Sequence, residues 1–442
     1  MRIFPVAAIF LVLIQPVAAE TLRDALTLAY ETNPTIRAER ARLGAVREGK
    51  NQAWAGALPQ ISATGSYSYV DSSQELNFGG GATPVDVTLN TVTAGINAEQ
   101  ALFTGFGNYN AIKQAEARIR AGGAQLAATE QAVLREVAAA YFSVERNMAV
   151  YELNKKNVDV LLRQNEMATV RFEVGEITRT DVAQADARLA GARANLSQAH
   201  GNLAIARATY TQLVGQMPGD LEAVEDLPEL PDTLDTAKTL AFEYAPAVIV
   251  AREQSEASRR QIKVARSAIM PRVSAVASYQ YADEPSSFVI RDEQFSYGLR
   301  ATMPLFLGGA NYSRIREAKA LHASDRSRII EAERQVEAAT IVAWERLLAS
   351  RAIIISARAA VDANALALEG VTQEALAGTR TTLDVLDAEQ EFLNSQVAHA
   401  SATRDAQSAA YTLLAAIGLL TTEAIGIADA GESGSALQLY RH

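Results

Sequence analysis

Residues 294–309 read QFSYGLRATMPLFLGG, and this segment contains the most informative pattern of the chain. Polar and apolar side chains alternate through its first ten residues, and a period of two is typical of a β-strand with two different faces. Pro304 is the last proline of the chain, and the residues that follow are rich in Ala, Leu, Glu, Gln and Arg, which are good helix formers. A strand with one apolar face therefore leads directly into a very long helical segment.

The same pattern occurs earlier in the sequence, because the chain is a tandem duplication. With a shift of 212 residues, Thr21–Tyr69 matches Thr233–Tyr281 at 18 of 49 positions. Beyond residue 95 the shift becomes 203, and residues 102–105 (LFTG) then match residues 305–308 (LFLG). The first copy has nine more residues than the second between positions 70 and 94, where Gly79–Gly81 predict an exposed loop.

Each copy is predicted to contain a helix, a hairpin of two strands, a very long helix, a turn and another helix. Apolar residues of the long helices recur at spacings of three and four, and alanine is prominent among them, which favours close coiled-coil packing. Residues 1–19 are predicted to be a signal peptide. Repeat 1 comprises residues 20–218, with strands at about 59–104, and repeat 2 comprises residues 237–420, with strands at about 271–307. An equatorial linker at 219–236 lies between the repeats, and residues 421–442 form a C-terminal equatorial segment or tail. The signal peptide is predicted from Arg2, the apolar run after it and the small-residue motif that ends at Ala19.

Composition excludes several classes of protein. The chain has 442 residues, no cysteine and a formal net charge of −10, which argues against disulfides, zinc–thiolate sites and nucleic-acid binding. Its four histidines are scattered, and it contains no Walker loop and no Gly-x-Ser-x-Gly elbow. The sequence therefore predicts neither an enzyme nor a protein with a cofactor or a bound metal.

The four predicted strands leave two architectures open. Alternation by itself fits both a half-buried sheet of a soluble protein and the strands of a transmembrane barrel. Four strands are too few to close a barrel, since the smallest outer-membrane barrels have about eight. If the sheet crosses a membrane, several chains must share one wall, and together they enclose a conduit.

The sequence resembles the TolC family of outer-membrane efflux and secretion channels. The resemblance rests on the duplication, on the two LFxG segments, and on the turns at 172–182 (FEVGEITRTDV) and 378–388 (GTRTTLDVLDA). It implies an α+β membrane protein in which a homotrimer forms a twelve-helix α-barrel from the duplicated long helices, continuous with a twelve-stranded transmembrane β-barrel. It also implies location in the outer membrane of a Gram-negative bacterium, with a large periplasmic extension.

The function implied by this resemblance is that of an exit channel in a tripartite efflux pump or a type I secretion system. Such a channel is a passive conduit, gated at its periplasmic end by an iris-like movement of helices. Its implied partners are a periplasmic adaptor (a membrane fusion protein), an inner-membrane transporter of ABC or RND type, and outer-membrane lipid. The alternative is a periplasmic coiled-coil adaptor or scaffold without a pore, and the cargo stays open between drugs, metals and a secreted protein.

Two aspartates near the second turn are candidate pore residues. The pattern Thr381-x-x-Asp384 predicts a capping box at a helix start, and Thr178-x-x-Asp181 repeats it in the first copy. Capping does not account for Asp387, whose counterpart in the first copy is glutamine. By the resemblance, Asp384 and Asp387 form two rings of carboxylates at the pore aperture, where such rings attract cations.

The resemblance also assigns a gate latch and a docking surface. The latch would consist of Arg380, Thr180 and Asp181, with Ala375 at a position where the family typically has a tyrosine. The periplasmic adaptor would dock on two turns, which comprise Val174, Gly175 and Glu176 in the first copy and Ala377, Gly378 and Thr379 in the second. The glycines of both turns are also suited to end a helix.

Overall fold

The computed structural model describes residues 19–77, 81–224 and 227–426, and the chain divides into two compact units. The described part of the helix unit consists of residues 19–37, 129–241 and 337–426, and the sheet unit consists of residues 38–128 and 242–336. The predicted signal peptide, except for Ala19, and residues 427–442 of the predicted C-terminal segment lie outside the described residues.

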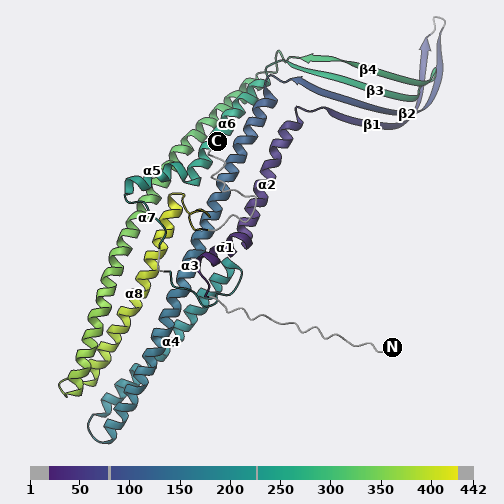
Figure 1. Ribbon diagram of the computed structural model, residues 1–442. Coiled ribbons are helices and arrows are strands. Elements are labelled where there is room, and N and C mark those ends of the chain that lie inside the picture. The colour runs from purple at the N-terminus through teal and green to yellow at the C-terminus, as the bar shows by residue number, and fades with distance from the viewer. Residues whose placement is uncertain (1–18, 78–80, 225–226, 427–442) are drawn as a thin grey trace, which may run out of the picture. The chain divides into compact units, whose positions relative to one another are not determined.

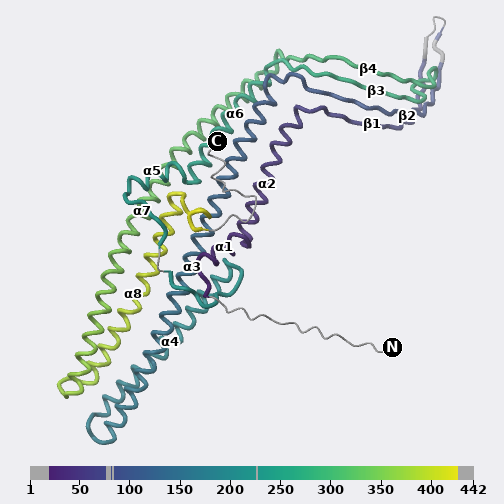
Figure 2. Tube along the Cα trace, in the orientation of Figure 1, coloured from purple at the N-terminus to yellow at the C-terminus, as the bar shows by residue number. Residues whose placement is uncertain are grey.

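Two long helix hairpins make up most of the helix unit (Figures 1 and 2). The first joins α3 (Gly107–Glu173) to α4 (Arg179–Val214), and the second joins α7 (Ala310–Leu376) to α8 (Thr382–Ala416). Residues 107–128 of α3 and 310–336 of α7 belong to the sheet unit. The helix unit also contains α1 (Leu22–Thr32) and most of α5 (Leu234–Tyr244). Its core combines a few fully buried aromatic side chains, such as Tyr141, Phe142 and Tyr210, with many buried alanines, as the composition predicted.

Each copy begins with two helices, whereas the sequence predicted one. In the first copy α1 ends before α2 (Pro34–Ala55), and in the second α5 ends before α6 (Pro246–Ser267). Proline excludes the helical conformation for the residue before it. Asn33 and Ala245 accordingly have extended backbones, with ψ of 125° and 121°.

The sheet unit is built around four antiparallel strands in the order β1-β2-β3-β4 (Figure 1). The strands are β1 (Gln60–Asn77), β2 (Ala82–Phe103), β3 (Arg272–Ser286) and β4 (Val289–Thr302). The end of β4 corrects one expectation, because the sequence predicted the strands of the second copy to extend to about residue 307, whereas β4 ends at Thr302. Pro304 has no N–H for a ladder hydrogen bond, so the ladder stops before it.

The strand register collects the apolar side chains on one face of the sheet. Ile96 pairs with Tyr279, and Tyr279 pairs with Phe295 on the next strand, so these three side chains form one row. Hydroxyl groups lie on the opposite face, where Ser66 hydrogen-bonds Thr93 at 2.7 Å across one strand pair. Large apolar side chains of the first face are exposed, among them Tyr67, Ile96, Phe295, Tyr297 and Leu299.

The linker between the repeats binds the start of the first copy. Glu20 forms a parallel bridge with Leu221, and its side chain accepts a hydrogen bond from the Tyr210 hydroxyl. The buried Tyr141 hydroxyl lies 2.8 Å from the carbonyl oxygen of Glu20 and 2.6 Å from that of Glu222. These contacts connect residues far apart in sequence within the helix unit.

Among the described residues, no helix combines the length and the low polarity required to cross a bilayer.

Candidate functional site: the two helix turns

At the turn between α3 and α4, the first helix ends at a glycine and the second begins after an N-cap residue. Gly175 has a φ of +80°, which other residues adopt only with strain. Its N–H donates to the carbonyl of Phe172, and the N–H of Glu176 donates to that of Arg171. These two bonds define a Schellman motif, which satisfies carbonyl groups at the end of the helix.

The turn between α7 and α8 has the same geometry. Gly378 also has a φ of +80°, and its N–H donates to the carbonyl of Ala375 while that of Thr379 donates to Glu374. The duplicated sequence therefore produces duplicated turns. Both turns end one long helix and reverse the chain within a few residues.

An ion pair closes each turn, with the charges exchanged between the copies. In the first turn Arg171 of the helix pairs with Glu176 of the loop at 2.8 Å. In the second turn Glu374 of the helix pairs with Arg380 of the loop, also at 2.8 Å. This contact raises the pKa of Arg380 above its ordinary value. Within the described chain, Arg380 is thus engaged in its own turn, and no hydrogen bond joins it to Thr180 or Asp181 there.

Both predicted capping boxes are formed. The Asp181 carboxylate accepts hydrogen bonds from the backbone N–H and the hydroxyl of Thr178, at 2.9 and 2.8 Å. Asp384 accepts the same two bonds from Thr381, also at 2.9 and 2.8 Å. These bonds, the backbone one first, hold the pKa of both carboxyl groups below their ordinary value. Asp384 is therefore charged at neutral pH and only partly exposed, and one of its oxygens is already occupied by the helix cap.

Asp387 has a partner that the sequence analysis did not identify. Its carboxylate pairs with the guanidinium group of Arg188 on α4, so this ion pair joins the two hairpins of the helix unit. Leu386, the residue before Asp387, packs in a buried cluster with Leu189, the residue after Arg188, and with Leu161 of α3. The polar link therefore lies beside an apolar contact between the same helices.

A second unanticipated group lies two residues farther along α8. Burial raises the pKa of the Glu389 carboxyl above its ordinary value, in contrast to the lowered pKa of Asp384. The sequence does show that Arg188 is a cation two helical turns after Asp181, the last residue of the first capping box. Nothing in the sequence, however, indicated that it faces Asp387.

The remaining predicted residues form the exposed tips of the hairpins. Thr180 is exposed at the start of α4, and Val174 is 73% exposed at the first turn. Ala377 and Thr379 are exposed at the second turn, and the Thr379 hydroxyl donates to the carbonyl of Glu374. Each tip presents a short apolar residue, a glycine and a polar residue to solvent. The described residues contain no group of three or more acidic or histidine side chains that could hold a metal ion.

Comparison with known proteins identifies the class to which this fold and these turns belong. The family model described as outer membrane efflux protein matches residues 25–216 and 239–419, which are the two copies of the duplication. The chain is 33% identical over 414 residues to the outer membrane efflux protein BepC of Brucella suis, with 93% of this chain and 88% of that protein covered. It is 26% identical over 423 residues to the outer membrane protein TolC of Vibrio cholerae, with 93% and 94% covered. The solved structure of the Campylobacter jejuni CmeC outer membrane channel superimposes with a TM-score of 0.79 at 16% identity, with 95% of this chain and 88% of that chain covered.

The chain belongs to the outer membrane efflux protein family. It is an outer-membrane exit channel for efflux or type I secretion with a periplasmic extension, and it acts as a passive conduit rather than as an enzyme. Channels of this kind work with adaptors and inner-membrane transporters. The fold class and the function predicted from the sequence are confirmed at this level.

Proposed function

We propose that three copies of this chain form the channel and that the two helix turns form its periplasmic gate. The observation that carries the proposal is the sheet, which has one exposed apolar face, one polar face and two free edges at β1 and β4. An open sheet of this kind requires partners at its edges when it lies in lipid, because no water is available to unpaired backbone groups. Three chains supply twelve strands, above the minimum of about eight for a closed barrel.

The gate is proposed at the turns because two kinds of contact hold the hairpin tips there. Each turn is closed by its own ion pair, and the Arg188–Asp387 pair joins one hairpin to the other. All of these groups are partly exposed, so each pair is weak and can exchange partners. In the latch proposed here, Arg380 leaves Glu374 and binds Asp181 and Thr180 of a neighbouring hairpin.

The aperture is proposed to carry the rings of Asp384 and Asp387 in unequal roles. Three Asp384 carboxylates attract cations, whereas each Asp387 is already balanced by Arg188. The exposed tips, Val174-Gly175-Glu176 and Ala377-Gly378-Thr379, are the proposed docking surface for the periplasmic adaptor. An inner-membrane transporter of ABC or RND type supplies the energy in this scheme.

The cysteine-free sequence permits a direct test of the gate. A bismaleimide linker added to the Arg188→Cys, Asp387→Cys variant bridges α4 and α8 in a protein without other thiols. We expect the bridge to hold the channel at low conductance in planar bilayers, and a cleavable linker to restore opening. Each single-cysteine variant with the same reagent is the control. Free opening of the bridged protein contradicts the gate, and a mass other than that of a trimer contradicts the assembly.

A further inference from the structure

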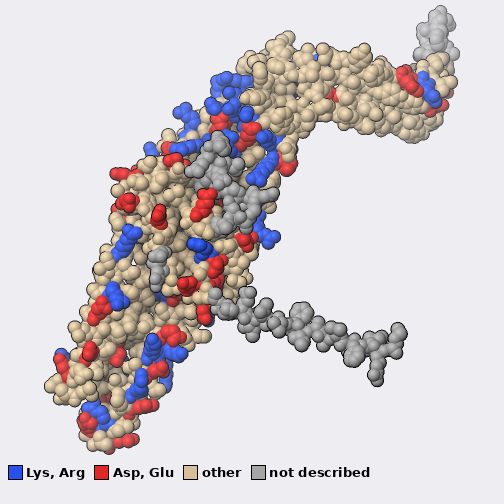
Figure 3. All heavy atoms as spheres, in the orientation of Figure 1, with Lys and Arg blue, Asp and Glu red and all other residues tan. Residues whose placement is uncertain are grey.

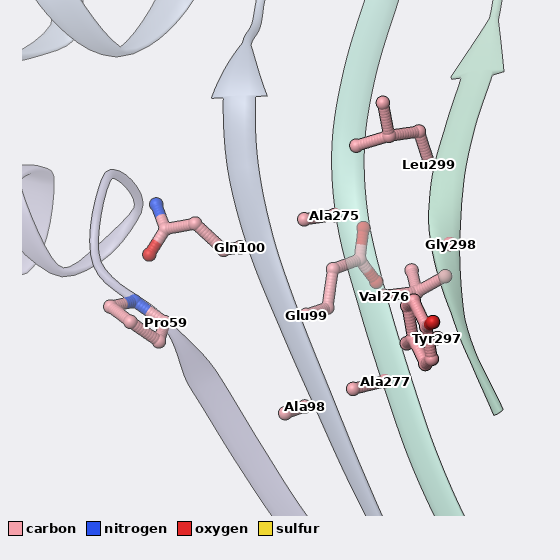
Figure 4. A pocket seen from close by; sticks show the side chains of 10 residues that line it. All are labelled: Pro59, Ala98, Glu99, Gln100, Ala275, Val276, Ala277, Tyr297, Gly298 and Leu299. Carbon is pink, nitrogen blue, oxygen red and sulfur yellow. The ribbon is translucent and has the colours of Figure 1, made fainter. Parts of the chain in front are cut away.

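The base of the sheet, where the strands join the helices, has an apolar groove of about 530 Å³ (Figure 4). Three alanines from neighbouring strands form its floor: Ala98, Ala275 and Ala277. The lining also includes two polar residues of β2, Glu99 and Gln100. Tyr297 and Leu299 of β4 lie on one side of these alanines, and Pro59 lies on the other. Small side chains in the middle of an otherwise bulky apolar face therefore leave an elongated depression.

The register shows that this groove belongs to the exposed apolar face. Ala98 pairs with Ala277, which pairs with Tyr297, and Ala275 pairs with Leu299. The next row along the sheet consists of Ile96, Tyr279 and Phe295, all large. Large side chains therefore occupy the rows farther from the helices, and the groove lies at the end of the sheet where Pro59 precedes the first residue of β1.

Four helix ends adjoin the same end of the sheet, and they are strongly basic. Connections of only 3 to 7 residues join the strands to α2, α3, α6 and α7. Residues 43–55, 107–120, 256–267 and 310–319, called here the basic helix ends, contain twelve Lys and Arg and four Glu, in a chain whose net charge is −10. Figure 3 shows this concentration of basic side chains on the helices next to the sheet, and on the face shown the adjoining surface of the sheet is almost free of charge.

Many of these cations have no carboxylate partner within the described chain. On α6, Arg259 and Arg260 share Glu256, but Lys263 and Arg266 are exposed without a partner. On α7, Arg316 and Lys319 are likewise exposed and without a partner among the described residues. Unpaired cations collected against an apolar surface match the chemistry of an anionic amphiphile.

We propose that the groove and the basic helix ends together bind an anionic phospholipid of the periplasmic leaflet, with an acyl chain on the alanine floor and the phosphate on the cations. The site rests on the proposal above that the sheet lies in the membrane. Its position agrees with a bilayer, because the β3 residues that line the groove lie three to five residues after Arg272, which is about 10 to 17 Å from the strand start at about 3.3 Å per residue. The headgroup then lies level with the helix ends.

The test compares two lipids that differ in charge. Purified trimers are incubated in detergent with equal amounts of phosphatidylglycerol and phosphatidylcholine of identical acyl chains, and the retained lipid is measured by mass spectrometry. We expect phosphatidylglycerol to be retained about fivefold better or more at low salt, since one cation near a headgroup contributes about that factor. The preference is expected to disappear in 1 M salt.

Two variants separate the headgroup site from the acyl site. Lys263→Glu with Arg266→Glu is expected to abolish the phosphatidylglycerol preference, and Arg193→Glu on α4, an exposed arginine with no partner among the described residues, is its control. Ala277→Phe fills the groove and is expected to reduce retention of both lipids. Its control is Ala94→Phe, which adds the same bulk farther along the same face.

Equal retention of both lipids by the wild-type protein overturns the proposal, and so does unchanged retention in the Ala277→Phe variant. A change in ion selectivity of the pore in the charge-reversed variant, with lipid retention intact, assigns the cations to the lumen and also overturns it. Single-channel conductance of the wild-type protein is recorded in parallel. A normal conductance with no lipid preference refutes the lipid site alone, whereas absence of conductance refutes the channel itself.

Discussion

The ion pair between Arg188 and Asp387 offers the sharpest test of how the hairpins are held together. We expect Arg188→Ala and Asp387→Ala each to raise the ratio of open to closed channel, because each removes the polar link from α4 to α8. The Arg188 and Asp387 side chains are 40% and 54% exposed, so solvent and salt screen the pair. Exposed pairs contribute about 0.2–1 kcal/mol each.

Symmetry multiplies this small energy. Three pairs in the low half of that range give about 1 kcal/mol in total, or about a fivefold change in the open-to-closed ratio. The assay is single-channel recording in planar bilayers with a double-mutant cycle, in which the coupling energy isolates the pair itself. Recording at 0.1 M and at 1 M salt adds a second readout, since screening at the higher concentration should remove most of the coupling.

The control is Arg193→Ala, which removes an exposed arginine of the same helix that has no partner among the described residues. Strict additivity of the two single variants at 0.1 M salt would refute the reasoning, because it would mean that the two groups do not interact in the closed channel. A coupling that persists unchanged at 1 M salt would place the pair in a dry environment, which contradicts its exposure.

Three further predictions concern the turns and the helix core. Gly378→Ala is expected to lower the free energy of unfolding by about 1–2 kcal/mol per copy because Gly378 has a positive φ. Gly191→Ala, in open space within α4, is expected to raise it by about 0.5–1 kcal/mol. Thermal melting checks this, because the two variants should shift the melting temperature in opposite directions. Hydrogen bonds from the N-cap Thr381 lower the pKa of Asp384, so the cap stabilises the start of α8 above the ordinary pKa of 3.8, and this stabilisation is lost as the pH falls below that value. Conductance recorded from pH 5 to pH 3 should therefore show opening of the channel at the acid end. A folded channel that does not open at pH 3 contradicts the role of the cap. Tyr141→Phe removes the hydroxyl that contacts the carbonyl groups of Glu20 and Glu222, and it should lower the free energy of unfolding by about 0.5–1.5 kcal/mol. Tyr411→Phe, whose hydroxyl makes no hydrogen bond among the described residues, should cost little, and similar losses for both would show that the hydroxyl contact is unimportant.

Much of the architecture was predictable because it depends on local rules. The alternation around Tyr297 predicted a two-faced strand, and the pairing of strands places its side chain on the apolar face. The glycine and threonine of the sequence GTRT at 378–381 predicted the end of one helix and the cap of the next, and both are formed. The helix breaks that precede Pro34 and Pro246 were not anticipated, because each copy was predicted to begin with one helix.

The candidate site was only partly predictable. Asp384 was identified both as a cap and as a candidate pore residue, and the structure shows its capping bonds. The partner of Arg380 within its own turn, Glu374, was missed because the resemblance directed attention to the other turn. The rings, the latch and the docking surface remain proposals that the experiments above address.

Features that arise from neighbouring residues could be read from the sequence: strand faces, helix caps, glycine turns and the duplication that repeats them. Contacts between distant residues became visible only in the folded chain, such as Arg188 with Asp387, 199 positions apart, and the alanines that the strand register brings into one groove. The physical reason is range. Backbone geometry and capping act within a few residues and can be read along the chain, whereas an ion pair or a groove depends on how helices and strands pack, and that arrangement is set by the burial of many side chains at once.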